Sequence, residues 1–207
     1  MYLDRQLREY LDALASASPT PGGGSTAALS GAMGTALVCM VARLTVGKVE
    51  YAAVHTEIAE IIQSAEALRA RFQTLMAEDM EAYGRLSACF KLPKTTGEEK
   101  AARAKAVQVS LVDAALVPLE MAERAVELVR YCLRIAEIGN KNVLSDIATA
   151  STLASSAASG ASWMVRVNIQ GLKDQAQAEE LNHRLNGALH AVTEGCQRVI
   201  QVIGERG

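Results

Sequence analysis

Residues 19–25 read PTPGGGS and place three consecutive glycines directly before a long apolar stretch. Glycine loses more backbone entropy on folding than any other residue, so this run indicates a turn that only glycine tolerates or a close approach to the main chain. Glycine amides that lead into a helix N-terminus can bind a negative charge or a carbonyl oxygen. From the spacing alone, a tight packing turn is the more common explanation.

Two charged residues at the borders of apolar segments could take part in proton chemistry. Lys48, in LTVGK, follows the apolar stretch, where a lysine also interacts favourably with the helix dipole. Asp79, in AEDMEAY, has Tyr83 one turn later on the same face of an expected helix. For Asp79 the alternative is a solvated carboxylate on an amphipathic helix, and Glu78 and Glu81 are expected on the surface.

A polar group opens the helix that we expect at residues 143–170. Asn140, Asn142, Ser145 and Asp146 crowd the segment GNKNVLSD. Helix capping explains one or two of them, with Asn142 as the N-cap or with Ser145 and Asp146 in the first turn. It does not readily explain all four, which makes the group a candidate ligand site.

Asn168, in WMVRVNIQGLKD, lies near the end of the same expected helix. A polar amide in such an apolar setting needs hydrogen-bond partners, and a ligand could be one of them. Arg166 and Lys173 nearby, together with Arg43, could hold a substrate carboxylate. Surface placement is the alternative for these three cations.

Composition limits the classes of function. The chain has 207 residues, enough for one domain with a sizeable core. Its 21 basic and 23 acidic residues give a net charge of −2, which argues against a nucleic-acid surface. The N-terminal segment MYLDRQLREY is charged and lacks an apolar core, so no signal peptide is expected and we expect a cytoplasmic protein.

The residues that commonly bind metals are scattered. Cys39, Cys89, Cys132 and Cys196 form no CxxC pair, and we expect them to be small buried residues. The three histidines show no metal-binding spacing with carboxylates. No GxGxxG, Walker or GxSxG motif occurs, so nucleotide-binding loops and a serine nucleophile elbow are not predicted.

Helical periodicity recurs along the chain, whereas strand patterns are nearly absent. The sequence predicts helices at about residues 2–16, 25–46, 50–90, 98–137, 143–170 and 175–204. Ser25 is the expected N-cap of the second helix, Thr96 or Gly97 starts the fourth, and Pro118 is expected to bend it. We therefore expect an all-α fold, with one helical-bundle domain of long antiparallel helices over residues 1–207.

Residues 26–42 carry no charge and could be mistaken for a membrane span. Small residues dominate this segment and no second segment is as apolar, so a buried central helix is expected, with no membrane partner. The expected helix at 143–170 is also rich in Ala and Ser. Exposed small-residue faces of this kind suit close helix packing between subunits, and we expect a homodimer.

Seven segments occur in an order that resembles one family. They are PTPGGGS, LTVGK, EDMEAY, LPKTTGEEK, VPLEMAE, GNKNVLSD and VNIQGLKD. Together they resemble the folate-specific cyclodeaminase/cyclohydrolase family, over about residues 5–200. Each motif alone is weak, but seven in the same order with similar spacing are specific. Lys141 departs from the pattern, since relatives often have an uncharged residue there.

The resemblance implies an all-helical fold, dimers of that fold and a folate cleft lined by the glycine loop. It implies no metal and no redox cofactor, only a tetrahydrofolate substrate. By motif match, the implied catalytic residues are Lys48, Asp79 and Asp146. The implied substrate-binding residues are Gly22, Gly23, Gly24, Ser25, Asn142, Ser145 and Asn168.

The resemblance implies one of two reactions at the same carbon. A cyclohydrolase adds water to the bridging carbon of 5,10-methenyltetrahydrofolate and gives 10-formyltetrahydrofolate. A cyclodeaminase lets N10 attack a formimino carbon on N5 and releases ammonia. Because the chain is a lone domain of family size without an attached formiminotransferase, we expect a cyclohydrolase, with a cyclodeaminase as the alternative.

Asp79 would accept or donate a proton, or stabilise the amidinium cation. Lys48 would polarise the developing oxygen or relay a proton. Asp146, Asn142 and Asn168 would hold the pterin or orient the water. A non-catalytic folate-binding module is a further alternative, although three charged residues around one cleft argue against it.

Overall fold

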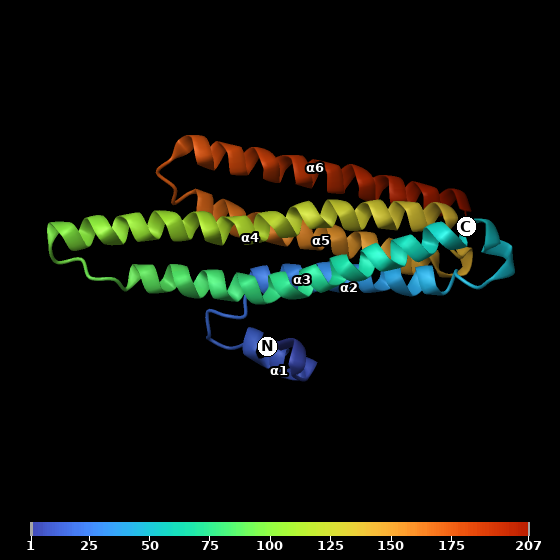
Figure 1. Cartoon of the computed structure of the whole chain (residues 1–207), viewed down its shortest axis with the longest axis horizontal. Helices are drawn as coiled ribbons and strands as arrows, with labels where there is room; N and C mark the ends of the chain where they lie inside the picture. The colour runs from blue at the N-terminus through green and yellow to red at the C-terminus, as the bar shows by residue number, and fades with distance from the viewer. Residues whose placement is uncertain (1, 207) are drawn as a thin grey trace.

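The computed structural model describes residues 2–206, and all of the regular structure in this range is helical (Figure 1). The α-helices are α1 (Leu7–Leu14), α2 (Gly23–Arg43), α3 (His55–Phe90), α4 (Gly97–Ile138), α5 (Leu144–Ile169) and α6 (Gln175–Arg206). Short 3-10 turns occupy Tyr2–Asp4, Val49–Val54 and Lys141–Val143. The predicted all-α class is confirmed.

The helix boundaries agree with the predicted ones to within a few residues, except at two N-terminal ends. The expected first helix is split into a 3-10 turn and the short α1, and a 3-10 turn also precedes α3. α4 begins at Gly97 behind a capping box, in which Thr96 Oγ1 accepts from the Glu99 amide at 3.1 Å. Pro118 lies buried inside α4, and the helix continues through it.

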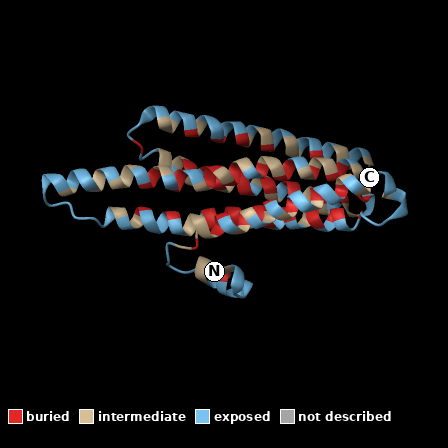
Figure 2. Cartoon of the chain, in the orientation of Figure 1, coloured by how far each residue is buried: buried red, intermediate tan, exposed pale blue. Residues whose placement is uncertain are grey.

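The five long helices pack as an antiparallel bundle (Figure 1). α3 and α4 lie in front of α2 and α5 in this view, and α6 packs against α4 and α5 at one edge. α1 lies outside the bundle, connected to α2 by a loop. Figure 2 shows buried residues along the middle of the bundle, whereas the projecting ends of α3 and α4 are mostly exposed.

Small residues let α2 approach its neighbours closely. A Cβ added to Gly31 would lie 2.4 Å from the ring of Phe72 on α3, and one added to Gly34 would lie 3.0 Å from the backbone oxygen of Ala150 on α5. The core therefore combines few aromatic rings with close backbone contacts, as the alanine-rich sequence predicts.

α2 and α5 run antiparallel, so the start of each helix lies beside the end of the other. Gly23 at the start of α2 lies beside Met164 near the end of α5. At the other end, the Asn140 amide donates to Thr45 Oγ1 at 3.0 Å. Because of this pairing, the beginning of α2 and the end of α5 form one end of the bundle, and the 44–48 turn and the start of α5 form the other.

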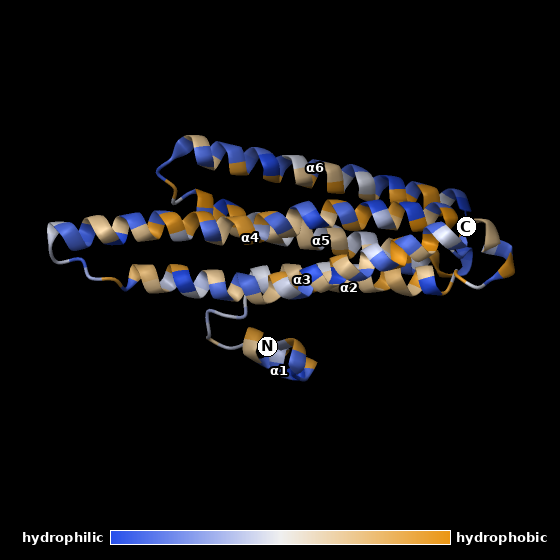
Figure 3. Cartoon of the chain, in the orientation of Figure 1, coloured by the Kyte–Doolittle hydropathy of each residue, from blue (hydrophilic) through white to orange (hydrophobic). Residues whose placement is uncertain are grey.

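α2 is long and apolar enough to cross a membrane by length and composition, but most of its apolar window is buried inside the bundle. Its inner face includes Ala28, Val38 and Val41, all fully buried. The prediction of a buried central helix is confirmed. Figure 3 shows hydrophilic colour along much of α6, whereas hydrophobic colour recurs along α2.

The outward side of the α2–α5 pair is apolar although it is exposed. On α2, Met33 and Met40 are 45% and 37% exposed, and on α5, Trp163 and Val167 are 62% and 63% exposed. We call the surface formed by these four residues the α2–α5 outer face. No Asp, Glu, Lys or Arg occurs from Gly23 to Ala42 or from Ile147 to Val165, so this face carries no charge over most of its length.

Candidate functional site

A cavity of about 560 Å³ lies where the N-terminus of α2 meets α3, α4 and α5. Its wall combines the glycine loop with one carboxylate, one amide and several apolar side chains. The lining residues are Pro19, Thr20, Gly22, Gly23, Gly24, Asp79, Ala82, Tyr83, Leu86, Phe90, Val107, Leu111, Ala114, Met164, Val167, Asn168 and Gly171. Its size and its mostly apolar wall are typical of a small-molecule site.

Asp79 on α3 lies directly against the first turn of α2. Its carboxylate accepts a hydrogen bond from the Ser25 backbone amide. A Cβ added to Gly24 would lie 2.0 Å from Asp79 Oδ1, so only glycine at position 24 leaves room for this carboxylate. The glycine run is therefore needed for a close approach, and the group that approaches Gly24 is a side chain of the protein itself.

Burial raises the pKa of Asp79 from 3.8 to about 6, although the Ser25 amide opposes part of this shift by stabilising the anion. A carboxylate with a pKa near 6 is ionised at neutral pH and is basic enough to accept a proton during a reaction. Such a pKa suits a general base, which works best when its pKa lies near the operating pH.

A hydroxyl network fixes the start of α2 behind Asp79. Ser25 Oγ donates to the Gly22 carbonyl at 2.8 Å and accepts from the Gly22 amide at 3.2 Å. Ser25 was the predicted N-cap, but Gly22 occupies that position and Ser25 caps the turn from within it. The Tyr10 hydroxyl lies 3.3 Å from Ser25 Oγ and 3.2 Å from Thr26 Oγ1, so α1 supports the same turn.

Asn168 on α5 lines the cavity with its amide orientation fixed by the backbone. Its Nδ2 donates to the carbonyls of Ala114 at 2.8 Å and Met164 at 2.9 Å. Since both amide hydrogens are used, its Oδ1 is left as the group that can accept a hydrogen bond from a ligand.

The apolar wall was missed in the sequence analysis. Tyr83, Leu86 and Phe90 follow Asp79 on one face of α3, and Val107 and Leu111 face them from α4. Their spacing is that of any helix core, so the pattern alone does not separate a cavity wall from ordinary packing. The one available signal was the spacing from Asp79 through Tyr83 to Phe90, which puts rare aromatic residues on the face of a candidate catalytic residue.

The structure brings together Gly22, Gly23, Gly24, Ser25, Asp79 and Asn168 among the residues singled out from the sequence. Lys48, Asn142, Ser145 and Asp146 lie at the opposite end of the α2–α5 pair. α2 has 21 residues and a helix rises about 1.5 Å per residue, so the two groups of one chain lie about 30 Å apart. We call these four residues the distal polar group.

Of the two predicted ways to start α5, the structure shows Ser145 and Asp146 in the first turn, and Asn142 is not the N-cap. Val143, not Asn142, is the N-cap of α5, because Asn140 caps the preceding 3-10 turn by accepting from the Asn142 amide at 3.1 Å. Asn142 and Ser145 are exposed, and Asp146 is half-buried. Their side chains are therefore available at the surface rather than used in caps.

The three candidate cations for a substrate carboxylate have different surroundings. Arg43 is the last residue of α2, so it lies far from the cavity at the start of this helix, and it pairs with Glu66 at 2.8 Å. The Arg166 guanidinium lies over the ring of Trp163, at 5.5 Å from the ring centre, on the helix that carries Asn168. The backbone of Lys173 is held by the Gln108 side chain at 2.7 Å.

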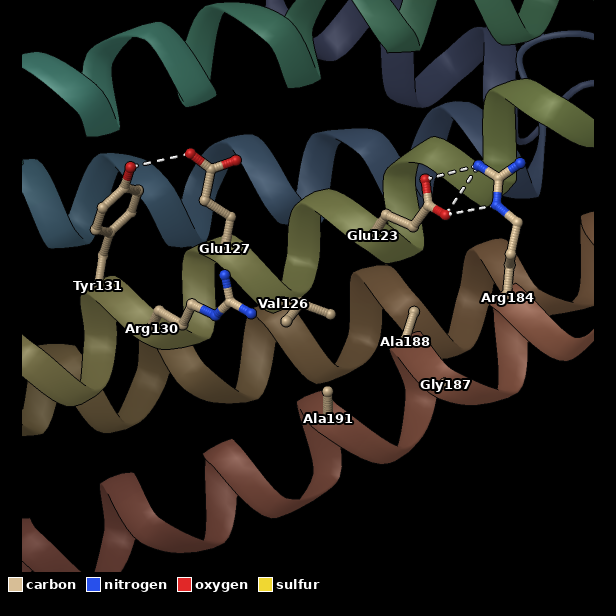
Figure 4. Close-up of a pocket in the computed structure, with 9 residues that line it drawn as sticks. All are labelled: Glu123, Val126, Glu127, Arg130, Tyr131, Arg184, Gly187, Ala188 and Ala191. Atoms are coloured by element: carbon tan, nitrogen blue, oxygen red, sulfur yellow. Dashed lines mark hydrogen bonds and ion pairs between the residues drawn. The ribbon is translucent and has the colours of Figure 1, made fainter.

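A second hollow lies between α4 and α6, and its polar side chains other than Arg130 are paired (Figure 4). Arg184 pairs with Glu123 at 2.9 Å, and the Tyr131 hydroxyl donates to Glu127 at 2.9 Å. Small residues of α6 form its floor. We regard it as an open groove beside an ion-pair network, since none of the described residues that line it is a buried carboxylate or belongs to the first turn of a helix.

An all-α bundle whose cavity combines a helix N-terminus, a carboxylate of raised pKa and an apolar wall belongs to the class of helical proteins with a small-molecule site. The chain belongs to the formiminotransferase-cyclodeaminase family, whose sequence pattern matches residues 6–187. The resemblance seen in the seven motifs is thus confirmed.

Characterised relatives include both activities. The methenyltetrahydrofolate cyclohydrolase of Methylorubrum extorquens is 40% identical over 197 residues, which is 95% of each chain. The formimidoyltransferase-cyclodeaminase of Mus musculus is 33% identical over 187 residues, which is 90% of this chain and 35% of the mouse protein. The structure of formiminotetrahydrofolate cyclodeaminase from Thermotoga maritima matches with a TM-score of 0.89 at 28% identity, covering 99% of this chain and 98% of that one.

Proposed function

We propose that this protein is a methenyltetrahydrofolate cyclohydrolase, which hydrolyses 5,10-methenyltetrahydrofolate to 10-formyltetrahydrofolate and needs no cofactor besides this substrate. The 40% identity to a cyclohydrolase over 95% of both chains supports this choice. The observation that carries the chemistry is Asp79, a carboxylate with a pKa of about 6 held in an apolar cavity at a helix N-terminus.

The cavity suits the proposed substrate. A flat pterin ring would lie between the apolar side chains of α3 and α4, such as Leu86 and Leu111. Asn168 Oδ1 would accept a hydrogen bond from a pterin N–H, since its own amide hydrogens are already used. The ionised Asp79 would face the amidinium cation, which is favourable in a site of low polarity.

The reaction then needs few steps. Water adds to the bridging carbon as Asp79 accepts one of its protons, and a neutral tetrahedral adduct forms. The bond from this carbon to N5 breaks as Asp79 returns the proton to N5. The adduct hydroxyl becomes the formyl carbonyl and releases its proton to solvent. The balance is one water consumed and one proton released.

The cyclodeaminase reaction is the second candidate, favoured by the close structural match to a cyclodeaminase. In that reaction N10 attacks a formimino carbon and ammonia leaves. A carboxylate at Asp79 could accept the N10 proton and pass it to the departing nitrogen. The two activities make the same demands on this cavity.

We also propose that the protein works as a homodimer. The α2–α5 outer face exposes Met33, Met40, Trp163 and Val167, and among the described residues the one charged group against them is the Arg166 guanidinium over the Trp163 ring. Exposed apolar surface of this kind is typical of an interface. A C₂ dimer would cover the face on both copies at once, since such an interface uses the same patch twice.

The decisive experiment is the absorbance decay of methenyltetrahydrofolate with purified protein at neutral pH, corrected for spontaneous hydrolysis. We expect a rapid enzyme-dependent decay and its loss by several orders of magnitude in Asp79→Asn. If wild-type protein leaves the decay unchanged but releases ammonia from 5-formiminotetrahydrofolate, the cyclodeaminase replaces the cyclohydrolase. Binding without either reaction would leave only the non-catalytic folate-binding module.

A further inference from the structure

The short helix α1 lies outside the bundle, and a single buried side chain belongs to it (Figure 1). That side chain is Tyr10, which is 3% exposed, whereas Leu7 and Leu11 on the same helix are 65% and 51% exposed. A helix of 8 residues is too short to be stable alone in water. Tyr10 is therefore the main anchor of α1 on the bundle.

The hydroxyl of Tyr10 belongs to a hydrogen-bond network whose direction follows from the number of hydrogens in it. Ser25 Oγ donates to the Gly22 carbonyl at 2.8 Å, and Thr26 Oγ1 donates to the same carbonyl at 2.9 Å. A serine or threonine hydroxyl has one hydrogen, so both hydrogens are used in these bonds. The Tyr10 hydroxyl, at 3.3 Å from Ser25 Oγ and 3.2 Å from Thr26 Oγ1, is therefore the donor to this pair.

Donation from Tyr10 strengthens the bonds that close the first turn of α2. A hydroxyl that accepts a hydrogen bond becomes a better donor, so the bonds in such a chain reinforce one another. Ser25 Oγ also accepts from the Gly22 amide at 3.2 Å, so it joins both backbone groups of Gly22. Because Ser25 is fully buried, a water molecule has little access to replace the tyrosine as its donor.

The residue that accepts from Tyr10 also holds the candidate base. The Ser25 backbone amide donates to the Asp79 carboxylate, and this bond lowers the pKa of Asp79 against the larger effect of burial. Ser25 thus contacts α1 through its side chain and α3 through its amide. A shift of the first turn of α2 would therefore change the hydrogen bond to Asp79.

The segment before α1 lies beside the part of α3 that carries Asp79. The two segments enclose a small hollow, which is lined by Tyr2, Arg5, Ala77, Met80 and Glu81. The rings of Tyr2 and Tyr10 pack edge to face, with their centres 5.6 Å apart. The N-terminal segment therefore lies against both helices that the bond from Ser25 to Asp79 connects.

Among the described residues, no charged group competes with this bond for control of Asp79. The pKa of Asp79 is shifted by burial and by the Ser25 amide, and no charged side chain is among the causes. In the cavity wall, Tyr83 on α3 is the other titratable residue, and the residues from α4 and α5 have no titratable group. α2 has no Asp, Glu, Lys or Arg before its last residue, and Arg5 lies over the ring of Tyr2.

We propose that Tyr10 is a positioning residue for the reaction: its hydroxyl acts through Ser25 to hold the first turn of α2 where the Ser25 amide meets the Asp79 carboxylate. Tyr10 does not line the cavity, so it affects the substrate only through these two residues. α1 thus contributes to the site although it lies outside the bundle. This inference rests on the proposed function, because Asp79 is the base in that reaction.

Tyr10→Phe tests the proposal, because it removes the hydroxyl and keeps the ring that anchors α1. We expect kcat to fall about 10-fold with KM nearly unchanged, since the hydroxyl does not contact the substrate. The midpoint of the pH profile of kcat/KM should rise by roughly half a unit, because a weakened amide bond stabilises the Asp79 anion less. A merely structural role would lower thermal stability and leave this midpoint in place.

The matched control is Tyr2→Phe, which removes the hydroxyl of the neighbouring ring. The Tyr2 hydroxyl forms no hydrogen bond with another described residue, so this variant should keep the wild-type kcat and pH midpoint. Ser25→Ala tests the route of the effect, because it removes the hydroxyl through which Tyr10 acts. In the Ser25→Ala background, Tyr10→Phe should change kcat and the midpoint little. Full additivity of the two substitutions would contradict a route through Ser25.

Carbon NMR titration of the Asp79 carboxyl, identified by its absence in Asp79→Asn, measures the same pKa without turnover. We expect it to be higher in Tyr10→Phe than in wild type and unchanged in Tyr2→Phe. If wild type turns over no substrate, the proposed function fails, and the titration still decides whether Tyr10 acts on Asp79. Active wild type together with an unchanged kcat and an unchanged titration in Tyr10→Phe would overturn the inference.

Discussion

At the scale of single residues, Gly24 and Asp79 form the closest fit in the site. Gly24→Ala would place a methyl group 2.0 Å from Asp79 Oδ1, so the carboxylate must leave its place beside the Ser25 amide. We expect kcat to fall at least 100-fold with little loss of helical content. Steady-state kinetics and circular dichroism of the variant check this.

The matched control is Gly23→Ala, where the added Cβ would meet Met164 at an ordinary contact distance of 3.5 Å. Its kcat should stay within a few-fold of wild type. If its KM rises sharply instead, the substrate itself lies against the glycine backbone. Equal kcat for the two alanine variants would contradict the role assigned to Gly24.

The raised pKa of Asp79 predicts that its ionised form destabilises the fold. Its pKa is about 6 in the folded protein and 3.8 ordinarily, so the contribution to stability is full below pH 3.8 and is lost as the pH rises through 6. Asp79→Asn should raise the free energy of unfolding by about 1–2 kcal/mol at pH 8, after allowance for partial solvent exposure.

Urea denaturation of both proteins at pH 4, 5 and 8 measures this difference, which should grow with pH and level off above about 7. The wild-type kcat/KM should rise through pH 6 over the same range if Asp79 acts as the base. A constant stability difference at all three pH values would contradict a raised pKa.

The residues of the cavity show how far sequence alone could lead. The glycine run, Asp79 and Asn168 were identifiable because polar groups and glycines interrupt an apolar helical pattern. Val107 and Leu111 were not, because an apolar side chain has the same spacing whether it faces a cavity or the core. Gly24 makes room for Asp79 through a contact between residues that are 55 positions apart in the chain, and no local sequence pattern predicts such a contact.

At the scale of helices, two glycines of α6 have opposite surroundings. A Cβ added to Gly195 would lie 2.3 Å from Val129 Cγ1 on α4, whereas one added to Gly187 meets nothing within 4 Å. Gly195→Ala should therefore lower the free energy of unfolding by about 1–3 kcal/mol, because a branched valine cannot move aside easily. Thermal or urea unfolding measures the change.

Gly187→Ala is the internal control on the same helix. It should raise the free energy of unfolding by about 0.5–1 kcal/mol, since alanine favours a helix more than glycine does. The same sign for both variants would mean that α6 does not pack on α4 as closely as described.

The helices themselves were predictable because their apolar periodicity persists over many turns and their ends carry clear signals. Thr96, one of the two predicted starts of the fourth helix, is the N-cap of α4, and the structure shows that it forms a capping box with Glu99. At α5 the alternative with Ser145 and Asp146 in the first turn was correct, whereas Asn142 as the N-cap was wrong because a preceding 3-10 turn shifts the start of the helix by one residue. The order in which the helices pack does not follow from periodicity. The periodicity of a helix indicates which of its sides is apolar, but not which other helix packs against that side.

At the scale of the whole molecule, Trp163 is a natural reporter of assembly. It is the only tryptophan in the sequence, and it lies 62% exposed on the α2–α5 outer face. Dilution of a homodimer would transfer this indole from an apolar interface into water. We expect the emission maximum to shift to longer wavelength as the concentration falls, together with a halving of the mass measured by light scattering.

Met33→Glu supplies the reference for this measurement, because a charge in the middle of the outer face should prevent association. Its emission should be long-wavelength at every concentration, with the helical content unchanged. An emission maximum that is the same in wild type and Met33→Glu at high concentration would contradict an interface on this face.

The projecting ends of α3 and α4 form one wall of the cavity, through Phe90 and Val107, yet none of residues 87–109 is buried. Backbone amides in such a sparsely packed hairpin exchange with deuterium through local opening, at a free-energy cost well below that of global unfolding. A bound ring held between the two helices would add the packing that the hairpin lacks. Ligand binding should therefore slow amide exchange at 87–109 far more than in the bundle centre. The binding of the ligand would then be coupled to the local ordering of this hairpin.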